Sequence, residues 1–245
     1  HPANGRKPAG PASHQGGASC PMTPLLIFGA GGHAREVAQI VHDINQAQPG
    51  SWHLLGFMAD PQAVALHPKP LPASLLGNSQ QALATHPQAH CVIAVGNSQA
   101  RRSIAARLRQ QHPGLRFATL VHPRAWVATG ASVGQGSVVF AGALINVDAS
   151  LGIHTSINLA CTISHDCQLG DYVSLGPGVH MAGAVTLGEA VDVGTGASIR
   201  PRVSVGANAV IGAGAAVVRD LLGDSTAVGV PARLRSSFTE RDQER

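Results

Sequence analysis

A histidine followed directly by an aspartate, His165-Asp166, is the pair of residues in this sequence best suited to acid–base chemistry. A neutral imidazole can accept a proton near pH 7, and an adjacent carboxylate can orient the ring and raise its basicity. The pair lies in CTISHDCQLGDY, two positions after Ile163. Spacing alone allows two interpretations, a general base or an ordinary histidine in a surface turn, so the elements around the pair must decide.

A glycine-rich loop in LLIFGAGGHAREVAQIV is the second candidate site. The apolar run Leu25 to Phe28 is followed by Gly29, Gly31 and Ala34 in the form G-x-G-x-x-A, and then by apolar residues at helical spacing. Such glycines let the backbone approach a phosphate, and the helix N-terminus favours its negative charge. The pattern predicts a phosphate-binding loop; the alternative is a turn whose glycines serve only close packing.

The elements after this loop predict a small Rossmann-like domain over residues 22–121. Asp60 follows the second strand, where a carboxylate can meet a ribose hydroxyl, and Gly96 follows the third. The further strands are expected at His53 to Met58, Cys91 to Val95 and Leu115 to Leu120, with a helix around Gln99 to Gln111. The pattern changes at His122-Pro123, which is the expected domain boundary because a residue before proline is held extended.

From Val127 to Val217 an aliphatic residue recurs every six positions, sixteen times without interruption. This period is typical of a parallel β-helix, in which each hexad is a short strand plus a turn and three hexads make one triangular coil. We expect the aliphatic residue to point inward, and a small residue two positions earlier, such as Cys161 or Cys167, to fill the core rather than form a redox pair. Gly or Asn one position later would turn the corner with a positive φ. The pattern predicts about five coils within residues 122–235.

Composition disfavours several other classes of function. Lysine occurs only at Lys7 and Lys69, and no basic run is interleaved with aromatics, so nucleic acid is not an expected partner. No apolar run is long enough to span a bilayer, so no membrane partner is expected. The four cysteines show neither C-x-x-C nor metal spacing, so we expect no metal and a reduced, cytoplasmic setting. Residues 1–21 predict a disordered lead-in or non-native extension, and residues 236–245 a polar tail.

Five segments, in this order, resemble the NeuD/PglD-like sugar O- or N-acyltransferases: LLIFGAGGHAREV, LGFMAD, CVIAVGN, ISHDCQLGDYVSLGPGVHMAGAVTLG and VGVPAR. The resemblance covers nearly all of residues 24–235. It implies an α/β plus all-β chain whose Rossmann-like domain precedes a left-handed β-helix, a homotrimer, and acetyl-CoA as co-substrate. It also implies N-acetylation of a nucleotide-linked 4-amino-deoxy sugar, with His165 as general base and Asp166 enhancing it.

The resemblance further implies binding residues in both halves of the chain. Those for the nucleotide-linked amino sugar are Gly31, Gly32, His33, Asp60, Gly96 and Asn158. Those for acetyl-CoA are Ser174, Gly183, Thr195 and Ala213. Two positions depart from the family pattern. Ser174 stands where members often carry a histidine associated with the thioester, and Ala59-Asp60 where a pair of acids is common, which leaves the donor contact and the nucleotide preference open.

Lysine and arginine are absent between Arg124 and Arg200, and five arginines then follow, at positions 200, 202, 219, 233 and 235. Because CoA carries several phosphates, a basic C-terminal end of the prism could hold its nucleotide part. Ordinary solubilising charge on an exposed cap explains the same distribution equally well. His180, directly before the inward-facing Met181, is expected to point outward.

Three other functions compete with N-acetylation. An O-acetyltransferase of a sialic-acid-type sugar would keep the fold and change only the acceptor from an amine to a hydroxyl. A solenoid that binds nucleotide sugars without catalysis is disfavoured by His165-Asp166 but kept open by Ser174. A nicotinamide oxidoreductase is disfavoured because no second half of a dinucleotide-binding fold follows the glycine loop.

Overall fold

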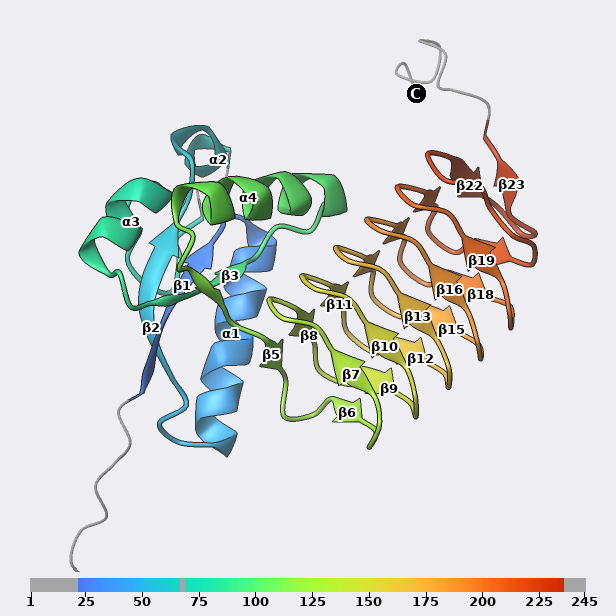
Figure 1. Cartoon of the computed structure of the whole chain (residues 1–245), viewed down its shortest axis with the longest axis horizontal. Coiled ribbons are helices and arrows are strands. Elements are labelled where there is room, and N and C mark those ends of the chain that lie inside the picture. Colours follow the sequence, from blue (N-terminus) through green and yellow to red (C-terminus); the bar gives the residue numbers. More distant parts are fainter. Residues whose placement is uncertain (1–21, 67–68, 236–245) are drawn as a thin grey trace, which may run out of the picture.

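The computed structural model describes residues 22–66 and 69–235, which form an α/β domain followed by a long β-solenoid (Figure 1). The extensions expected at 1–21 and 236–245 lie outside the described residues. Within the described part of the chain, no helix is long and apolar enough to cross a membrane.

The N-terminal domain is built on a four-stranded parallel sheet with the strand order β2-β1-β3-β4. Its strands are β1 (Thr23–Phe28), β2 (Trp52–Met58), β3 (His90–Ile93) and β4 (Arg116–Phe117). Its helices are α1 (Gly32–Ala47), α2 (Pro61–Ala65), α3 (Ser79–Thr85) and α4 (Ser98–Gln111). The first three predicted strands and the two long helices are confirmed, whereas the short helices α2 and α3 were not predicted. The single strand expected at Leu115 to Leu120 is instead divided into β4, which closes this sheet, and a second strand at Leu120–Val121 that pairs with the solenoid.

Both faces of this sheet are covered, which explains why β1 is apolar at every position from Leu25 to Phe28. Successive strand side chains point to opposite faces. Leu25 and Ile27 accordingly pack with α1, while Leu26 and Phe28 pack with α3 and α4. Burial on two sides produces a continuous apolar run rather than an alternating one.

The solenoid confirms the hexad pattern strand by strand, because each of its sixteen regular strands ends on one of the predicted aliphatic residues. These strands are β6 (Trp126–Val127), β7 (Ser132–Val133), β8 (Val138–Val139), β9 (Leu144–Ile145), β10 (Ser150–Leu151), β11 (Ser156–Ile157), β12 (Thr162–Ile163), β13 (Gln168–Leu169), β14 (Ser174–Leu175), β15 (His180–Met181), β16 (Thr186–Leu187), β17 (Asp192–Val193), β18 (Ser198–Ile199), β19 (Ser204–Val205), β20 (Val210–Ile211) and β21 (Ala216–Val217). β5 (Leu120–Val121) precedes them, and β22 (Thr226–Val228) and β23 (Arg233–Leu234) follow. The predicted left-handed β-helix is therefore the fold of this half of the chain.

The strands form three parallel sheets, one on each side of the triangular prism. The β8 sheet runs from β5 through β8, β11, β14, β17 and β20 to β22, where β23 is added antiparallel. The β6 sheet contains β6, β9, β12, β15, β18 and β21, and the β7 sheet contains β7, β10, β13, β16 and β19. A bridge between Val205 and Leu221 extends the β7 sheet by one layer. There are thus about six coils rather than the five predicted. The additional coil arises because β5 and the segment after Val217 also pair with solenoid strands, although they lie outside the six-residue aliphatic repeat.

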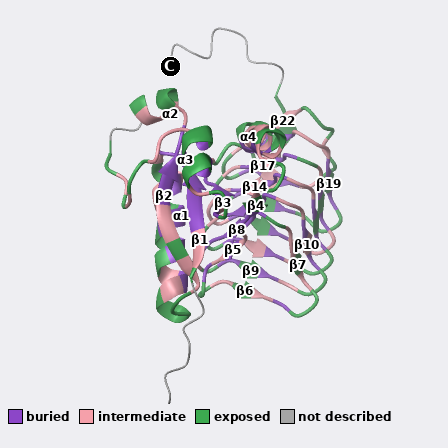
Figure 2. Ribbon diagram, turned by 60° about the vertical axis from the view of Figure 1, so that its left-hand side comes forward, coloured by how far each residue is buried: buried purple, intermediate pink, exposed green. Residues whose placement is uncertain are grey.

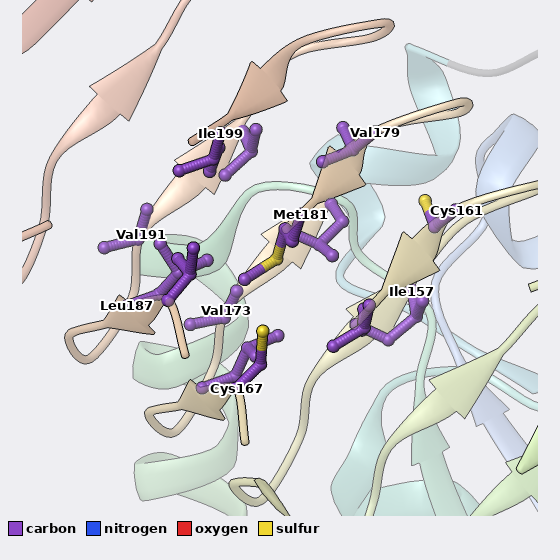
Figure 3. Close-up of a cluster of buried hydrophobic side chains, with 14 of the residues drawn as sticks. Ile157, Cys161, Cys167, Val173, Val179, Met181, Leu187, Val191 and Ile199 are labelled. Carbon is purple, nitrogen blue, oxygen red and sulfur yellow. The ribbon is translucent and has the colours of Figure 1, made fainter. Parts of the chain in front are cut away.

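The prism is filled by the aliphatic residues and by the small residues two positions before them (Figure 3). Cys161 and Cys167 are fully buried and free, with their Sγ atoms donating to the carbonyl oxygens of Gly176 at 3.1 Å and Ala182 at 3.2 Å. Burial raises the pKa of the Cys161 thiol to about 11. Both cysteines are core residues, as predicted.

The corner glycines have a different role from the one predicted. The residues with positive φ lie three positions after each aliphatic residue, for example Asp148 at 58° and Asp166 at 60°. The glycine one position after the aliphatic residue instead touches the next coil. A Cβ at Gly134 would lie 2.4 Å from the carbonyl oxygen of Gly152. Close approach of stacked backbones, and not a left-handed conformation, requires glycine at this position.

The two domains share an extensive interface, and the first coil begins inside the segment that the sequence assigned to the α/β domain. β5 pairs with β8 of the solenoid, two residues before the boundary predicted at residue 122. Val138 and Phe140 of the solenoid share a buried cluster with α1. At the start of α4, Ser98 Oγ donates to Asp192 Oδ2 at 2.8 Å. Figure 2 shows the buried parts of β1 and α1 running beside the coils.

Candidate active site

A cleft of about 410 Å³ lies at the carboxyl end of the parallel sheet and is lined by all five residues predicted there from the N-terminal half. They are Gly31, Gly32, His33, Asp60 and Gly96. Parallel strands present their carboxyl ends at one edge, which brings the segments after β1, β2 and β3 together. No side chain caps the N-terminus of α1 at Gly31, so its first N–H groups are available to an anion.

His33 connects this cleft to the solenoid. Its ring stacks on Phe140 with the centroids 5.4 Å apart, and its Nδ1 lies 3.3 Å from Glu36 Oε2. Burial lowers the pKa of the His33 imidazole below its ordinary value, which outweighs the opposing effect of Glu36. The side chain is therefore neutral at pH 7 and can act as a hydrogen-bond donor or acceptor at the cleft.

Asp60 is held at the cleft by Arg107, a residue that the sequence did not single out. Arg107 Nη2 donates to Asp60 Oδ2 at 2.9 Å, and its guanidinium lies 5.7 Å from the centroid of the Phe28 ring. The two side chains are about two-fifths exposed, so the pair orients the carboxylate without burying its charge.

His165 and Asp166 lie at the corner between the β6 and β7 sheets, which we call the His165 corner. The Nδ1 atom of His165 donates to Asp166 Oδ2 at 2.7 Å, since the carboxylate can only accept. The bond leaves Nε2 as the unprotonated nitrogen of the neutral ring. Both side chains are 59% exposed, so a reactant can reach this nitrogen from outside the prism.

Gly183 lies directly against the His165 ring, one coil further along the same corner. A Cβ at Gly183 would approach both His165 Cε1 and Nε2 to 2.6 Å. The chain is locked here by a hydrogen bond from the Ala184 amide to the His165 carbonyl at 2.9 Å. The imidazole can therefore occupy its observed position only because residue 183 has no side chain.

The His165 corner becomes basic in the coils beyond Gly183. The Arg202 amide donates to the Gly183 carbonyl at 3.0 Å, and Arg200, Arg202 and Arg219 line a groove of about 500 Å³. Positive charge is thus stacked above His165 along one edge of the prism. This arrangement can hold phosphate groups of a ligand that extends from the histidine toward the C-terminal coils.

The remaining predicted residues lie on other parts of the prism. Asn158, Thr195 and Ala213 follow β11, β17 and β20 at the corner between the β8 and β6 sheets, which we call the Asn158 corner. Ser174 is on β14, where its Oγ donates to the Gly96 carbonyl at 2.8 Å. One chain thus brings His165, Asp166 and Gly183 together, and separates them from the other predicted contacts of acetyl-CoA.

His180 lies on the outer side of the β6 sheet, exposed as predicted. Its Nδ1 is 2.9 Å from Thr162 Oγ1 on the neighbouring strand. Among the residues that the structure describes, no cluster of three or more His, Cys, Asp or Glu side chains could hold a metal ion.

The domain interface contains a buried polar cluster that the sequence did not reveal. Arg101, on α4, is only 2% exposed, and His154 is fully buried between Phe117 and Tyr172. Arg109 Nη2 lies 3.2 Å from His154 Nε2. Burial, together with the charges of Arg109 and Arg101, lowers the pKa of His154 to about 3. Helical spacing alone could not distinguish Arg101 from the other arginines of α4.

Replacing His154 by asparagine is expected to make the free energy of unfolding depend less on pH below about pH 6.5. The unfolded histidine binds a proton below about pH 6.5, whereas the folded one stays neutral until about pH 3, so wild-type stability falls with pH by about 1.4 kcal/mol per unit within this window. Asparagine tolerates the positive φ of 53° at this position and does not titrate. Urea unfolding at pH 7, 5.5 and 4.5 gives the free energy of unfolding of the wild type and the variant at each pH. If this free energy changed equally with pH in the two proteins, His154 would not have the lowered pKa described above.

Comparison with known proteins gives a consistent result over both domains. Residues 24–108 match the family model of the PglD N-terminal domain. The chain is similar to the acetyltransferase domain of PglB from Neisseria gonorrhoeae FA1090, with 31% identity and a TM-score of 0.76, covering 86% of this chain and 99% of that one. It is equally similar to PerB from Caulobacter crescentus, crystallised with CoA and GDP-perosamine, with 31% identity, a TM-score of 0.77, and coverage of 89% and 100%.

A more distant structure shares the same fold. WeeI from Acinetobacter baumannii AYE is 24% identical with a TM-score of 0.74, covering 87% of this chain and all of that one. No curated protein sequence matches this chain. The similarities above 30% extend over the whole of the matched chains, so they include the glycine loop, the solenoid and the His165 corner together.

Proposed function

Since the chain belongs to the NeuD/PglD-like family of sugar acyltransferases and is thereby an acetyl-CoA-dependent sugar acetyltransferase, we propose that its acceptor is the amino group of a nucleotide-linked 4-amino-deoxy sugar. The observation that carries the proposal is the pairing of His165 with Asp166, which leaves Nε2 free and accessible. The cleft at the glycine loop supplies the second requirement, a place for the nucleotide.

The reaction proceeds by direct transfer. The sugar amine attacks the thioester carbonyl of acetyl-CoA, His165 Nε2 takes the proton that the amine loses, and Asp166 stabilises the imidazolium. A C–N bond forms and the C–S bond breaks. The CoA thiolate then receives the proton from His165, so that free thiol and neutral imidazole are restored.

The developing negative charge on the thioester oxygen requires a hydrogen-bond donor. Gly183 lies so close to the His165 ring that a Cβ there would be 2.6 Å from Nε2, and the Gly183 N–H is our candidate for this role. No covalent acyl-enzyme is required. The thiols of Cys161 and Cys167 are buried in the prism, where burial raises their pKa values, so neither is placed to act as a nucleophile.

A second copy of the chain is needed to complete this site. The cleft and His33 lie beside Phe140 at the Asn158 corner, whereas His165 lies at a different corner of the coil. The predicted acetyl-CoA residues Thr195 and Ala213 lie at the Asn158 corner, and Gly183 at the His165 corner. Packing three prisms around a three-fold axis sets one corner of each chain against the other corner of its neighbour. We therefore propose a homotrimer with its active sites between subunits.

A thiol-release assay tests the proposed function. Acetyl-CoA is supplied with UDP-, GDP- and dTDP-linked 4-amino sugars, and with a sialic-acid-type sugar that offers only hydroxyl groups. We expect CoA release with at least one amino sugar and an acetamido product by mass spectrometry. Release with the hydroxyl acceptor alone would establish O-acetylation instead. Nucleotide-sugar binding without release under any condition would indicate a non-catalytic binding protein.

A further inference from the structure

We propose that Arg101 is a positioning residue for the nucleotide diphosphate, because it fixes the Gly96 wall of the cleft to the solenoid and places a positive charge behind that wall. The inference rests on the proposed function, which supplies the diphosphate.

Arg101 binds the cleft wall and the solenoid at the same time. Its Nη1 donates to the carbonyl oxygens of Val95 at 2.8 Å and Gly96 at 3.0 Å, both of which line the cleft. Its other nitrogens donate to the solenoid: Nε to the His154 carbonyl at 2.8 Å, and Nη2 to the Tyr172 carbonyl at 2.7 Å and to Ser174 Oγ at 2.9 Å. The planar guanidinium can satisfy all of these acceptors only in one orientation, so the loop and the solenoid are held in fixed register.

Arg101 contacts two consecutive coils of the solenoid, and the turn between them carries His165, which in the proposed trimer serves the site shared with the neighbouring subunit. His154 and Tyr172 occupy the same corner of consecutive coils, because the Tyr172 amide donates to the carbonyl of the neighbouring Ile153 at 2.8 Å. One turn of chain joins them, and His165 lies on this turn. Ser174 closes the connection through its own bond to the Gly96 carbonyl. A movement of Gly96 relative to this coil would break several hydrogen bonds at once.

The guanidinium of Arg101 makes no hydrogen bond to a carboxylate among the described residues, because all its acceptors are carbonyl or hydroxyl oxygens. The Asp192 carboxylate acts on its charge only electrostatically, without a hydrogen bond. Burial lowers the pKa of the guanidinium only to about 10, so it stays charged at pH 7. No lysine or arginine is among the residues that line the cleft, and the nearby Arg107 is already paired with Asp60. Arg101, which binds the Gly96 carbonyl from behind the cleft wall, therefore supplies a buried positive charge that favours a bound diphosphate.

The test compares Arg101→Gln with Arg102→Gln in the full-length protein. Arg102 is the next residue of the same helix, but its side chain is 38% exposed and lies near Glu189. Titration calorimetry with UDP, GDP and dTDP measures the Kd of the diphosphate, and steady-state kinetics separate KM for the nucleotide sugar from KM for acetyl-CoA. For R101Q we expect both Kd and KM for the nucleotide ligand to rise at least about tenfold, with KM for acetyl-CoA unchanged. R102Q is expected to match the wild type.

Ser174→Ala is a milder variant that keeps the proposal testable if R101Q does not fold. Loss of one hydroxyl between Arg101 and Gly96 is expected to raise KM for the nucleotide sugar several-fold without affecting KM for acetyl-CoA. Arg101→Lys retains the positive charge but lacks the planar guanidinium with its several N–H donors. Its affinity for the nucleotide ligand should therefore lie between those of R101Q and the wild type.

Three results would overturn the inference. An S174A effect confined to acetyl-CoA would place Ser174 in the thioester site, as the family resemblance implies. Equal increases of both KM values in folded R101Q would mean a general structural role. Unchanged Kd in folded R101Q would remove the positioning role while leaving the proposed function intact, whereas failure of the wild type to bind UDP, GDP and dTDP alike would contradict the proposed function itself.

Discussion

Replacing His165 by alanine is expected to lower kcat by at least about a hundredfold, with little change in stability. The imidazole is the group that would accept the amine proton, and Asp166, 2.7 Å from its Nδ1, holds the tautomer that exposes Nε2. Without the imidazole, the sugar amine must lose its proton to water in the transition state. Since the ring is 59% exposed, its removal leaves no cavity in the core.

The kinetics should be measured at saturating acetyl-CoA and saturating nucleotide sugar, so that kcat alone is compared. His42→Ala is the matched control, because His42 is an exposed histidine of α1 away from the His165 corner. Circular dichroism and the unfolding midpoint verify that H165A is folded. Wild-type turnover by folded H165A would refute the assignment of His165 as general base.

Replacing Gly183 by alanine is expected to lower kcat between about tenfold and a hundredfold, although alanine is chemically inert. The new Cβ would lie 2.6 Å from two atoms of the His165 ring, so the imidazole must rotate or shift. A displacement of about 1 Å can cost about a hundredfold when a reaction depends on alignment. The hydrogen bond between His165 and Asp166 would be strained by the same movement.

Gly114→Ala is the control for this experiment, because a Cβ at Gly114 meets no atom within 4 Å. Its kcat is expected to equal that of the wild type. For G183A, kcat should fall while the affinity for UDP or GDP stays unchanged, since the cleft is formed by other residues. Full activity in G183A would mean that His165 need not occupy its observed position during catalysis.

Local sequence patterns were sufficient for most of the architecture. A six-residue period requires only that each strand bury one aliphatic side chain, so every strand from β6 to β21 could be predicted from its own hexad. The order of strand, glycine loop and helix likewise identified the cleft, because all parallel strands end at one edge of the sheet. His165 and Asp166 are neighbours in the chain, and their pairing follows from that adjacency and needs no long-range contact.

Contacts between distant segments could be decided only by the tertiary structure. Arg101 is one of several arginines on α4 and becomes a buried clamp only because α4 packs against coils that lie about seventy positions later in the chain. The same packing directs the Ser174 hydroxyl to Gly96. Stacking of backbones, rather than a positive φ, explains the glycines that directly follow the aliphatic residues, such as Gly134. Sequence periodicity indicates which side chains of a strand or helix are buried. The contacts of Arg101 and Ser174 depend instead on which surfaces meet when the α/β domain packs against the prism.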